Sequence, residues 1–100
     1  MKLTVKEEVY DDLADIVNWY ENQSAGFGEK FLDEWENTLK FVAKNPLAFQ
    51  TQFKSFRHAK VIRFPYLVIF EIDKDEIIVY MVIHTSRKPG KRYRRIKRKK

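Results

Sequence analysis

Apolar residues recur at helical spacing in the first part of the chain. From Val9 to Tyr20 they fall at i, i+4, i+7, i+8 and i+11, which predicts an amphipathic helix from about Lys6 to Glu21. Acidic residues gather near its start, where the helix dipole favours anions. Before this helix, the alternation of apolar and polar residues from Lys2 to Val5 predicts a short β-strand.

A second amphipathic helix follows a turn cluster at residues 22–26. Aromatic and aliphatic residues from Phe27 to Val42 recur at spacings of four and three. Ser24 is the expected N-cap, and the helix is expected to end at Lys44, because Pro46 disfavours the helical conformation of the residue before it. The short connection predicts that the two helices form an antiparallel hairpin.

The pattern of the second half of the chain predicts β-strands. Residues 47–56 predict a loop with a short strand at about Gln50–Lys54, and three strands follow at His58–Phe64, Tyr66–Ile72 and Ile77–His84. Pro65 separates the first two of these because it cannot donate to a strand ladder. The order β-α-α-β-β-β predicts an α+β domain, in which an N-terminal strand and a helical hairpin accompany a mainly antiparallel sheet, with the helices on one face.

The tight turn at residues 73–76 sets the register of the last two strands. A loop of two or four residues pairs Ile72 with Ile77, Phe70 with Val79, Val68 with Met81 and Tyr66 with Ile83. This uncharged face is expected to cover the helices. The opposite face would hold Leu67, Ile69, Glu71, Ile78, Tyr80, Val82 and His84, with Arg63 diagonal to His84. Because that face also carries Leu, Ile and Val, it needs a cover, either the C-terminal tail or a partner chain.

Composition narrows the class of protein. One hundred residues, 44% of them hydrophobic, suit a single domain with a modest core. The absence of cysteine excludes disulfides and Cys-based zinc or thiol chemistry. The longest apolar run, Ile77–Ile83, has seven residues, which is too short to cross a bilayer, and the N-terminus has no apolar signal core. The lack of cysteine fits a reducing cytosol, although many secreted proteins also lack it, and we expect no membrane partner.

Charge divides the chain into two halves. Residues 1–50 carry five Lys or Arg and ten Asp or Glu, a net −5, whereas residues 51–100 carry fifteen and four, a net +11. The last ten residues, KRYRRIKRKK, hold eight of these bases. Such a basic block is typical of a protein with a polyanionic partner, most simply nucleic acid. The alternative is that it forms only a solvated surface or a disordered tail. We predict one domain over residues 1–90 and a basic tail over residues 91–100, with Tyr93 and Ile96 anchoring the tail to the sheet.

His84 is the candidate for proton transfer. Between Arg63 and Arg87 an imidazole is disfavoured as a cation, so it can accept a proton. The two guanidiniums would grip a phosphodiester and stabilise its developing charge, while Tyr80 or Tyr93 stacks on a base. This set suits metal-free RNA cleavage, in which the base takes the proton of a ribose 2′-hydroxyl.

Each of these residues also has a structural interpretation. A single histidine at a strand end is more often a hydrogen-bonded structural residue than a catalyst, and Arg63 would also reach Glu71 on the same face. Two histidines and scattered carboxylates show no metal-ligand spacing, so we expect neither a metal nor another cofactor.

Local motifs follow one another in a set order along nearly the whole chain. They are a first helix ending in Trp19-Tyr20, then Gly26-Phe27-Gly28 leading to Phe31, Asn45-Pro46 after the second helix, Arg63-Phe64-Pro65-Tyr66 before an apolar strand, and His84-x-x-Arg87 with Pro89 just after. In order and spacing they resemble the RelE/ParE superfamily of toxins from type II toxin–antitoxin modules.

The resemblance implies a small cytoplasmic bacterial toxin, of the kind associated with plasmid stabilization, that a cognate antitoxin neutralises by wrapping around it. RelE-like members are ribosome-dependent mRNA endonucleases (mRNA interferases) that need no metal, and this is the function that we expect. ParE-like members instead block DNA gyrase and have lost the nuclease constellation, which is the first alternative. A basic RNA-binding module without toxicity is the second.

The candidate site residues fall into three groups. The catalytic candidates are His84, Arg63, Arg87 and Tyr93. The candidates for binding nucleic acid are Lys54, Lys60, Arg92, Arg94, Arg95, Lys97 and Arg98. The candidates for binding the antitoxin are Leu67, Ile69, Ile78, Tyr80 and Val82, on the sheet face that needs a cover.

Deletion of Lys97–Lys100 tests the prediction of a polyanionic partner. Fewer phosphate contacts release fewer counterions, so the truncated protein is expected to bind its nucleic-acid-containing target more weakly and with a shallower dependence on salt. Titrations at several salt concentrations measure both quantities. An unchanged slope would assign these bases to a solvated surface.

Overall fold

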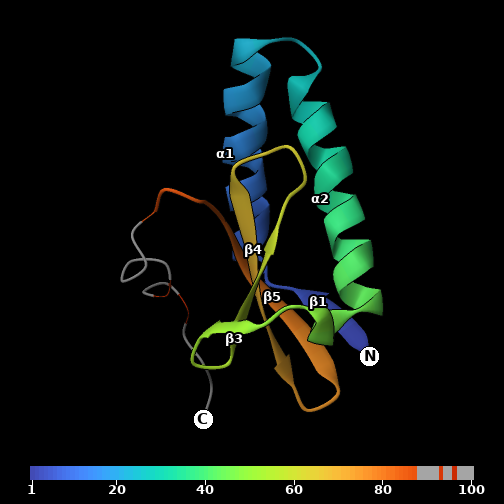
Figure 1. Cartoon of the computed structure of the whole chain (residues 1–100). Helices are drawn as coiled ribbons and strands as arrows, with labels where there is room; N and C mark the ends of the chain where they lie inside the picture. The colour runs from blue at the N-terminus through green and yellow to red at the C-terminus, as the bar shows by residue number, and fades with distance from the viewer. Residues whose placement is uncertain (88–92, 94–95, 97–100) are drawn as a thin grey trace.

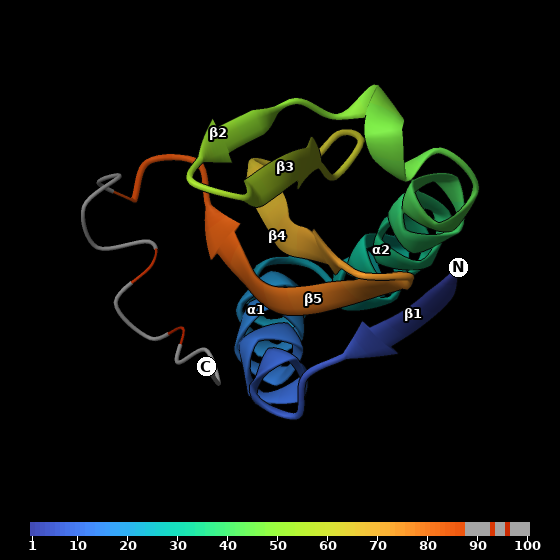
Figure 2. The ribbon, with the colours of Figure 1, turned by 90° about the horizontal axis from the view of Figure 1, so that it is seen from below.

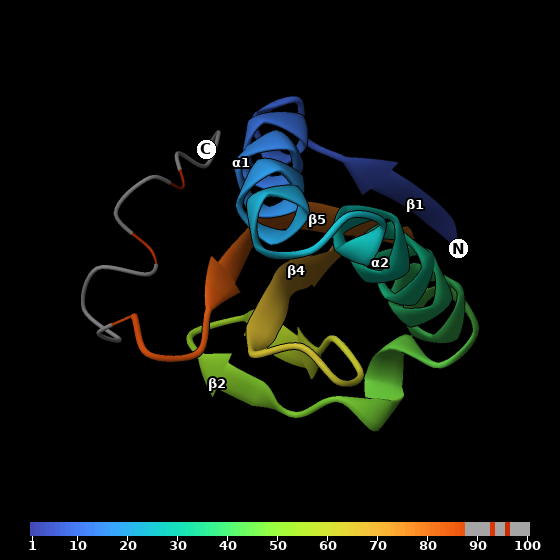
Figure 3. The same ribbon diagram turned by 90° about the horizontal axis from the view of Figure 1, so that it is seen from above.

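Two α-helices lie on one face of a five-stranded sheet in the computed structural model, which describes residues 1–87, 93 and 96. The elements run β1 (Lys2–Val5), α1 (Glu8–Gln23), α2 (Phe27–Lys44), η1 (Pro46–Ala48), β2 (Thr51–Phe53), β3 (Phe56–Lys60), β4 (Tyr66–Asp73) and β5 (Glu76–His84). Figure 1 shows the two helices side by side, and Figure 3 shows both on the same side of β4 and β5. The predicted α+β class is confirmed.

The sheet has the order β1-β5-β4-β3-β2. β1 pairs in parallel with the first half of β5, and the other three pairings are antiparallel. Figure 2, seen from below, shows β1 at one edge beside β5 and β2 at the other. The predicted N-terminal strand and the mainly antiparallel sheet are therefore confirmed, and the short strand expected near residues 50–54 is β2.

Both helix starts differ from the prediction, for separate reasons. α1 begins at Glu8 and not at Lys6, because the Lys6 N–H donates to the Val79 carbonyl (2.9 Å) and continues the pairing of β1. α2 is preceded by Gly26 in the left-handed conformation (φ +87°), which glycine adopts without strain, and not by a Ser24 cap. Ser24 instead closes α1, because its N–H donates to the Tyr20 carbonyl.

β3 ends earlier than the sequence pattern predicts. It covers Phe56–Lys60 instead of His58–Phe64, because the chain turns at residues 61–64, where the Phe64 N–H donates to the Val61 carbonyl (3.3 Å). Arg63 occupies the left-handed region in this turn (φ +70°). The turn carries Arg63 out of the sheet, so the predicted alternation of faces does not persist to Pro65.

A β-bulge changes the register of the β4–β5 hairpin halfway along. The predicted pairs Ile72–Ile77 and Phe70–Val79 are confirmed, but Ile69 pairs with Met81, which leaves Tyr80 as an extra residue on β5. Beyond the bulge the predicted partners are wrong. Val68 lies opposite Val82 and Tyr66 lies opposite His84, instead of Met81 and Ile83.

The bulge redistributes side chains between the two faces of the sheet. Val82 joins the core against the helices, with Val68, Phe70 and Val79. Met81 and Ile83, predicted on the helix face, pack on the opposite face instead. An extra residue inverts the alternation of every residue after it, so one bulge accounts for all three changes.

Glu21 and Gly28 close the helical hairpin tightly. The Glu21 carboxylate accepts the N–H groups of Gly26 (3.1 Å) and Gly28 (2.6 Å) at the start of α2, and these hydrogen bonds lower the pKa of Glu21. A Cβ at Gly28 would lie 2.8 Å from Val17 Cγ1 and 2.9 Å from the Val17 carbonyl oxygen. The two helices therefore approach at a position where only glycine fits.

Gly28→Ala is expected to lower the free energy of unfolding by about 1–3 kcal/mol, because the added methyl group overpacks the contact with Val17. Gly26→Asn is the matched control. A Cβ there meets nothing within 4 Å, and Asn tolerates the left-handed conformation, so the change should stay below about 1 kcal/mol. Urea titrations compare the two; equal effects would contradict the close approach at Gly28.

Candidate functional site

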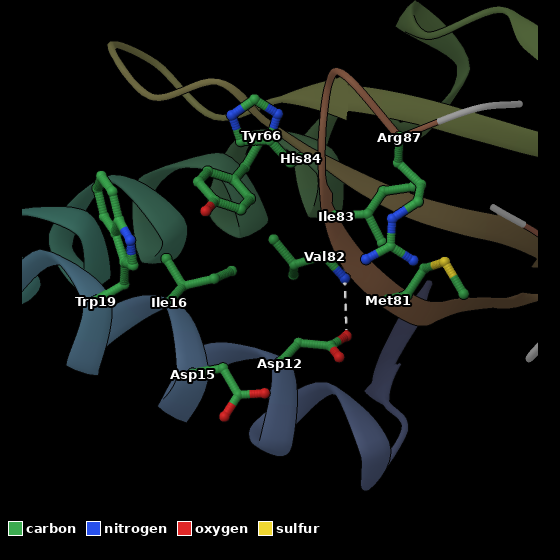
Figure 4. Close-up of a pocket in the computed structure, with 10 residues that line it drawn as sticks. All are labelled: Asp12, Asp15, Ile16, Trp19, Tyr66, Met81, Val82, Ile83, His84 and Arg87. Atoms are coloured by element: carbon green, nitrogen blue, oxygen red, sulfur yellow. Dashed lines mark hydrogen bonds between the residues drawn. The ribbon is translucent and has the colours of Figure 1, made fainter. Parts of the chain in front are cut away.

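His84 and Arg87 line a hollow of about 330 Å³ where α1 meets the end of β5. Figure 4 shows Asp12, Asp15 and Trp19 coming from α1 on one side, with His84 and Arg87 on the side of β5. Its other lining residues are Ile16, Tyr66, Met81, Val82 and Ile83. The register shift creates this arrangement, because it turns His84 toward Tyr66, whose ring meets the imidazole edge-on at 5.2 Å between centroids.

The His84 imidazole is oriented by its own turn. Its Nδ1 accepts the Ser86 N–H (3.0 Å) and also contacts the Ser86 hydroxyl (2.8 Å). A ring nitrogen that accepts an N–H carries no proton, so the proton of the neutral ring lies on Nε2. In this arrangement Nδ1, the nitrogen able to take a proton, already accepts a hydrogen bond from Ser86, and Nε2 is a donor.

Arg63 does not join His84 as predicted. Its guanidinium lies 3.8 Å from the Glu34 carboxylate of α2, and the side chain is 82% exposed. It lines a separate hollow of about 490 Å³ with Tyr20, Phe27 and Phe64. The expected partner Glu71 is engaged on the opposite face of the sheet, where it accepts the hydroxyls of Tyr80 and Ser55.

A third hollow connects these two. It has a volume of about 320 Å³ and is lined by Trp19, Tyr20, Pro65, Tyr66 and His84. It shares Trp19, Tyr66 and His84 with the hollow at Arg87, and Tyr20 with the hollow at Arg63. We call the three together the hairpin groove.

Two tyrosines form the middle of the hairpin groove. Burial raises the pKa of Tyr66, and burial followed by the neighbouring Tyr66 raises the pKa of Tyr20. Both phenols therefore stay neutral at physiological pH. Their rings pack edge-to-face at 6.3 Å, so they serve as a wall and not as a proton acceptor.

Tyr93 lies on the opposite face of the sheet. Its ring stacks on Phe53 (4.3 Å between centroids) and Phe56 (5.2 Å), and its hydroxyl is in hydrogen-bond contact with His58 Nε2. Tyr93 and Ile96 both pack against the second apolar cluster, as the sequence predicts. We call Phe53, Phe56, His58 and Tyr93 the aromatic shelf.

Of the predicted nucleic-acid contacts, Lys54 lies beside this shelf, whereas Lys60 contacts the turn that follows β3. Lys54 Nζ lies 5.3 Å from the centre of the Phe53 ring. Lys60 lies at the end of β3, and its Nζ donates to the carbonyls of Phe64 (3.2 Å) and Val61 (3.4 Å). The other candidates, Arg92, Arg94, Arg95, Lys97 and Arg98, lie outside the described residues, as does the predicted domain boundary at residue 90.

The predicted antitoxin-binding face is altered in two places. Val82 turns to the helix side, and Ile69 has no exposed surface in the cluster with Phe56, Met81 and Ile83. Leu67, Ile78 and Tyr80 keep the expected face and are half-buried. The cover that this face requires comes at least partly from Tyr93 and Ile96.

The sequence reasoning missed Trp19 and His58. The helical period places Tyr20 in the core and leaves Trp19 at the surface, where it is 55% exposed. An exposed tryptophan next to a buried tyrosine is a signal that was available. His58 pairs with Tyr93, which is 35 residues away, and no local pattern predicts that contact.

Across residues 1–87, 93 and 96 there is no cluster of His, Asp or Glu side chains able to hold a metal ion. Neither α1 nor α2 is long and apolar enough to cross a membrane.

Comparisons with known proteins agree on the fold. A family model described as the ParE toxin of the type II toxin–antitoxin system parDE matches residues 3–89. A solved structure, the chromosomal ParDE toxin–antitoxin system from P. aeruginosa, superposes with a TM-score of 0.75 at 16% identity, over 84% of this chain and 95% of that one. At this identity the structural likeness shows the fold. A search of curated proteins finds no match.

Tyr93→Ala is expected to lower the free energy of unfolding by about 1–2 kcal/mol, because it removes the stacking on Phe53 and Phe56. Tyr93→Phe keeps the ring and loses only the hydroxyl contact, which should cost less than about 1 kcal/mol. Tyr10→Ala, at an exposed tyrosine of α1, is the control. If Tyr93→Ala and Tyr10→Ala have the same small effect in denaturant titrations, Tyr93 does not anchor the chain on the shelf.

Proposed function

This chain belongs to the ParE toxin family of type II toxin–antitoxin systems, and from that premise we propose that it arrests bacterial growth by inhibiting DNA gyrase. The proposal combines the family with the implication of the sequence resemblance, in which ParE-like members block gyrase. A toxin of this family has a cognate antitoxin as its partner. The cytoplasm, where gyrase works on DNA, is the place of action that the proposal requires.

One observation favours gyrase inhibition over mRNA cleavage. The predicted catalytic residues are divided among three places: His84 with Arg87, Arg63 with Glu34, and Tyr93 with His58. In addition, Nδ1 of His84 accepts the Ser86 N–H, so the proposed base is engaged. A general base must reach the proton that it takes, and cations must surround the same phosphate. This distribution supports a toxin that acts by binding.

The aromatic shelf is the surface that we assign to the gyrase–DNA target. It combines stacked rings with Lys54, and the chain continues from Tyr93 into the basic run that ends at Lys100. Aromatic rings beside cations suit exposed bases and phosphates. A gyrase–DNA complex offers both.

mRNA cleavage is the second candidate, and the same shelf is what favours it. The contact between His58 Nε2 and the Tyr93 hydroxyl brings an imidazole and a phenol together beside Lys54. An imidazole, a phenol and an ammonium are groups that can transfer protons to and from a ribose and its phosphate. In this case His58, and not His84, would be the acid–base residue.

A supercoiling assay tests the proposal. Purified toxin is incubated with DNA gyrase, ATP and relaxed plasmid, and loss of supercoiled product is expected. Lys54→Glu should reduce the inhibition by about tenfold or more, because it places a like charge against phosphate, whereas Lys40→Glu on the surface of α2 is the control.

Induced expression separates the two candidates in cells. Gyrase inhibition predicts an SOS response and filamentation while mRNA stays intact. Rapid loss of translation with cuts inside codons, abolished by His58→Ala, would instead establish the nuclease. No growth arrest with either readout would contradict both.

A further inference from the structure

Glu71 is a buried carboxylate to which the proposed function gives no role. It is 2% exposed in β4, where the other residues from Tyr66 to Ile72 are apolar or aromatic. Burial of a carboxylate costs free energy unless hydrogen bonds replace its hydration. Here the carboxylate accepts the hydroxyls of Tyr80 (3.0 Å) and Ser55. A buried acid that the packing of an apolar strand does not require is a candidate for a functional role.

Ser55 belongs to a hairpin turn that is unfavourable by its own sequence. Phe53 pairs directly with Phe56, so the loop between β2 and β3 consists of Lys54 and Ser55. A two-residue hairpin loop favours positive φ at its first position, which glycine, asparagine and aspartate adopt most readily. This chain has Lys54 there, at φ +51°. Because a long side chain is strained in that region, the turn needs support from elsewhere in the fold.

Glu71 supplies that support. It lies directly opposite Phe56, the first residue after the loop, so its carboxylate reaches the Ser55 side chain although the two residues are 16 positions apart. β2 lies at the edge of the sheet (Figure 2), and all three of its residues are exposed, so it has no buried side chain of its own to anchor the turn. The loop conformation therefore depends on a hydrogen bond to the interior of the sheet.

The turn determines where the Lys54 side chain begins and in which direction it leaves the backbone. Its Nζ lies 5.3 Å from the centre of the Phe53 ring, at the edge of the aromatic shelf. A cation–ring contact at an exposed site is weak, so the ring alone does not hold the ammonium in place. A cation that the backbone places beside stacking rings before the target arrives binds phosphate with a smaller loss of conformational entropy.

We propose that Glu71 is a positioning residue for target binding. Through Ser55 it holds the left-handed turn that sets Lys54 beside the aromatic shelf, where the ammonium meets a phosphate of the nucleic-acid target. A carboxylate repels phosphate, so its contribution to binding comes through the groups that it orients. The inference rests on the proposed function, in which the shelf meets the gyrase–DNA complex, and it adds which buried group gives that surface its geometry.

Ser55→Ala is the direct test, because it removes the link to Glu71 and leaves the Lys54 charge in place. In the supercoiling assay, the toxin concentration that halves gyrase activity should rise about threefold or more, as for other residues that are coupled by contact. Thr4→Val is the matched control. Thr4 is also half-buried and donates its hydroxyl to a carboxylate, that of Glu76, but it lies in β1 at the other edge of the sheet. It should change the concentration by less than about twofold.

A double-mutant cycle tests whether Ser55 acts through Lys54. Lys54→Asn removes the ammonium, and the short asparagine side chain tolerates the left-handed conformation, so the loop keeps its shape. In that background Ser55→Ala should change inhibition by less than about twofold, because no cation remains to be positioned. A purely structural role for Ser55 predicts the same loss with and without Lys54. Circular dichroism melts establish that each variant is folded at the assay temperature.

Substitutions of Glu71 itself separate its hydrogen bonds from its charge. In Glu71→Gln the amide can accept one hydroxyl and donate to the oxygen of the other, so inhibition should stay within about twofold of wild type. Glu71→Ala removes both hydrogen bonds, and inhibition should fall at least as far as in Ser55→Ala. If Glu71→Ala does not fold, the cycle of Ser55 and Lys54 decides.

The outcomes separate this inference from the proposed function. Full inhibition by Ser55→Ala, or an equal loss in the Lys54→Asn background, would overturn the inference and leave gyrase as the target. If wild-type toxin does not inhibit gyrase, the proposed function fails, and the turn itself is measured by nuclear magnetic resonance. A positive φ at Lys54 brings its amide and α protons close, so their nuclear Overhauser effect should be strong in wild type and Thr4→Val and weaker in Ser55→Ala. An equally strong effect in Ser55→Ala would show that Glu71 does not hold the turn.

Discussion

The extra residue at Tyr80 decides which side chains meet on each face of this protein. It bulges from β5 opposite the step from Ile69 to Phe70, and its hydroxyl donates to the buried Glu71 carboxylate (3.0 Å). Glu71 also accepts the Ser55 hydroxyl, so the bulge is linked to the turn between β2 and β3. A buried carboxylate needs such partners, and here satisfying it holds the bulge in place.

Beyond the bulge, the end of β5 turns Val82 and His84 toward the helices. Val82 completes the core, and His84 turns toward Tyr66 at the side of α1. With a regular ladder, His84 would have faced the same side of the sheet as Tyr93 and His58. The bulge thus separates the hairpin groove, which is lined by Trp19, His84 and Arg87, from the aromatic shelf beside Lys54. One sheet therefore carries two surfaces of different chemistry on its two faces.

The elements of the fold could be predicted because each has its own periodic signal. The sequence pattern predicted α1 and α2, the strand at Lys2–Val5 and the first pairs of the β4–β5 hairpin. The bulge could not be predicted, because Val79–Ile83 is apolar throughout. Where apolar residues lie on both faces of a strand, the alternation of apolar and polar residues does not show which face a side chain is on. The orientation of His84 depended on the half of the hairpin beyond this apolar stretch, and the predicted grouping of His84 with Arg63 was therefore wrong.

A regular β4–β5 ladder and a bulged one place different residues directly opposite each other, and nuclear Overhauser effects between backbone protons distinguish them. We predict cross-strand contacts of Val68 with Val82 and of Tyr66 with His84, as in the bulged register. Contacts of Val68 with Met81 and of Tyr66 with Ile83 would contradict it. They would return His84 to the shelf side and remove the separation between the hairpin groove and the aromatic shelf.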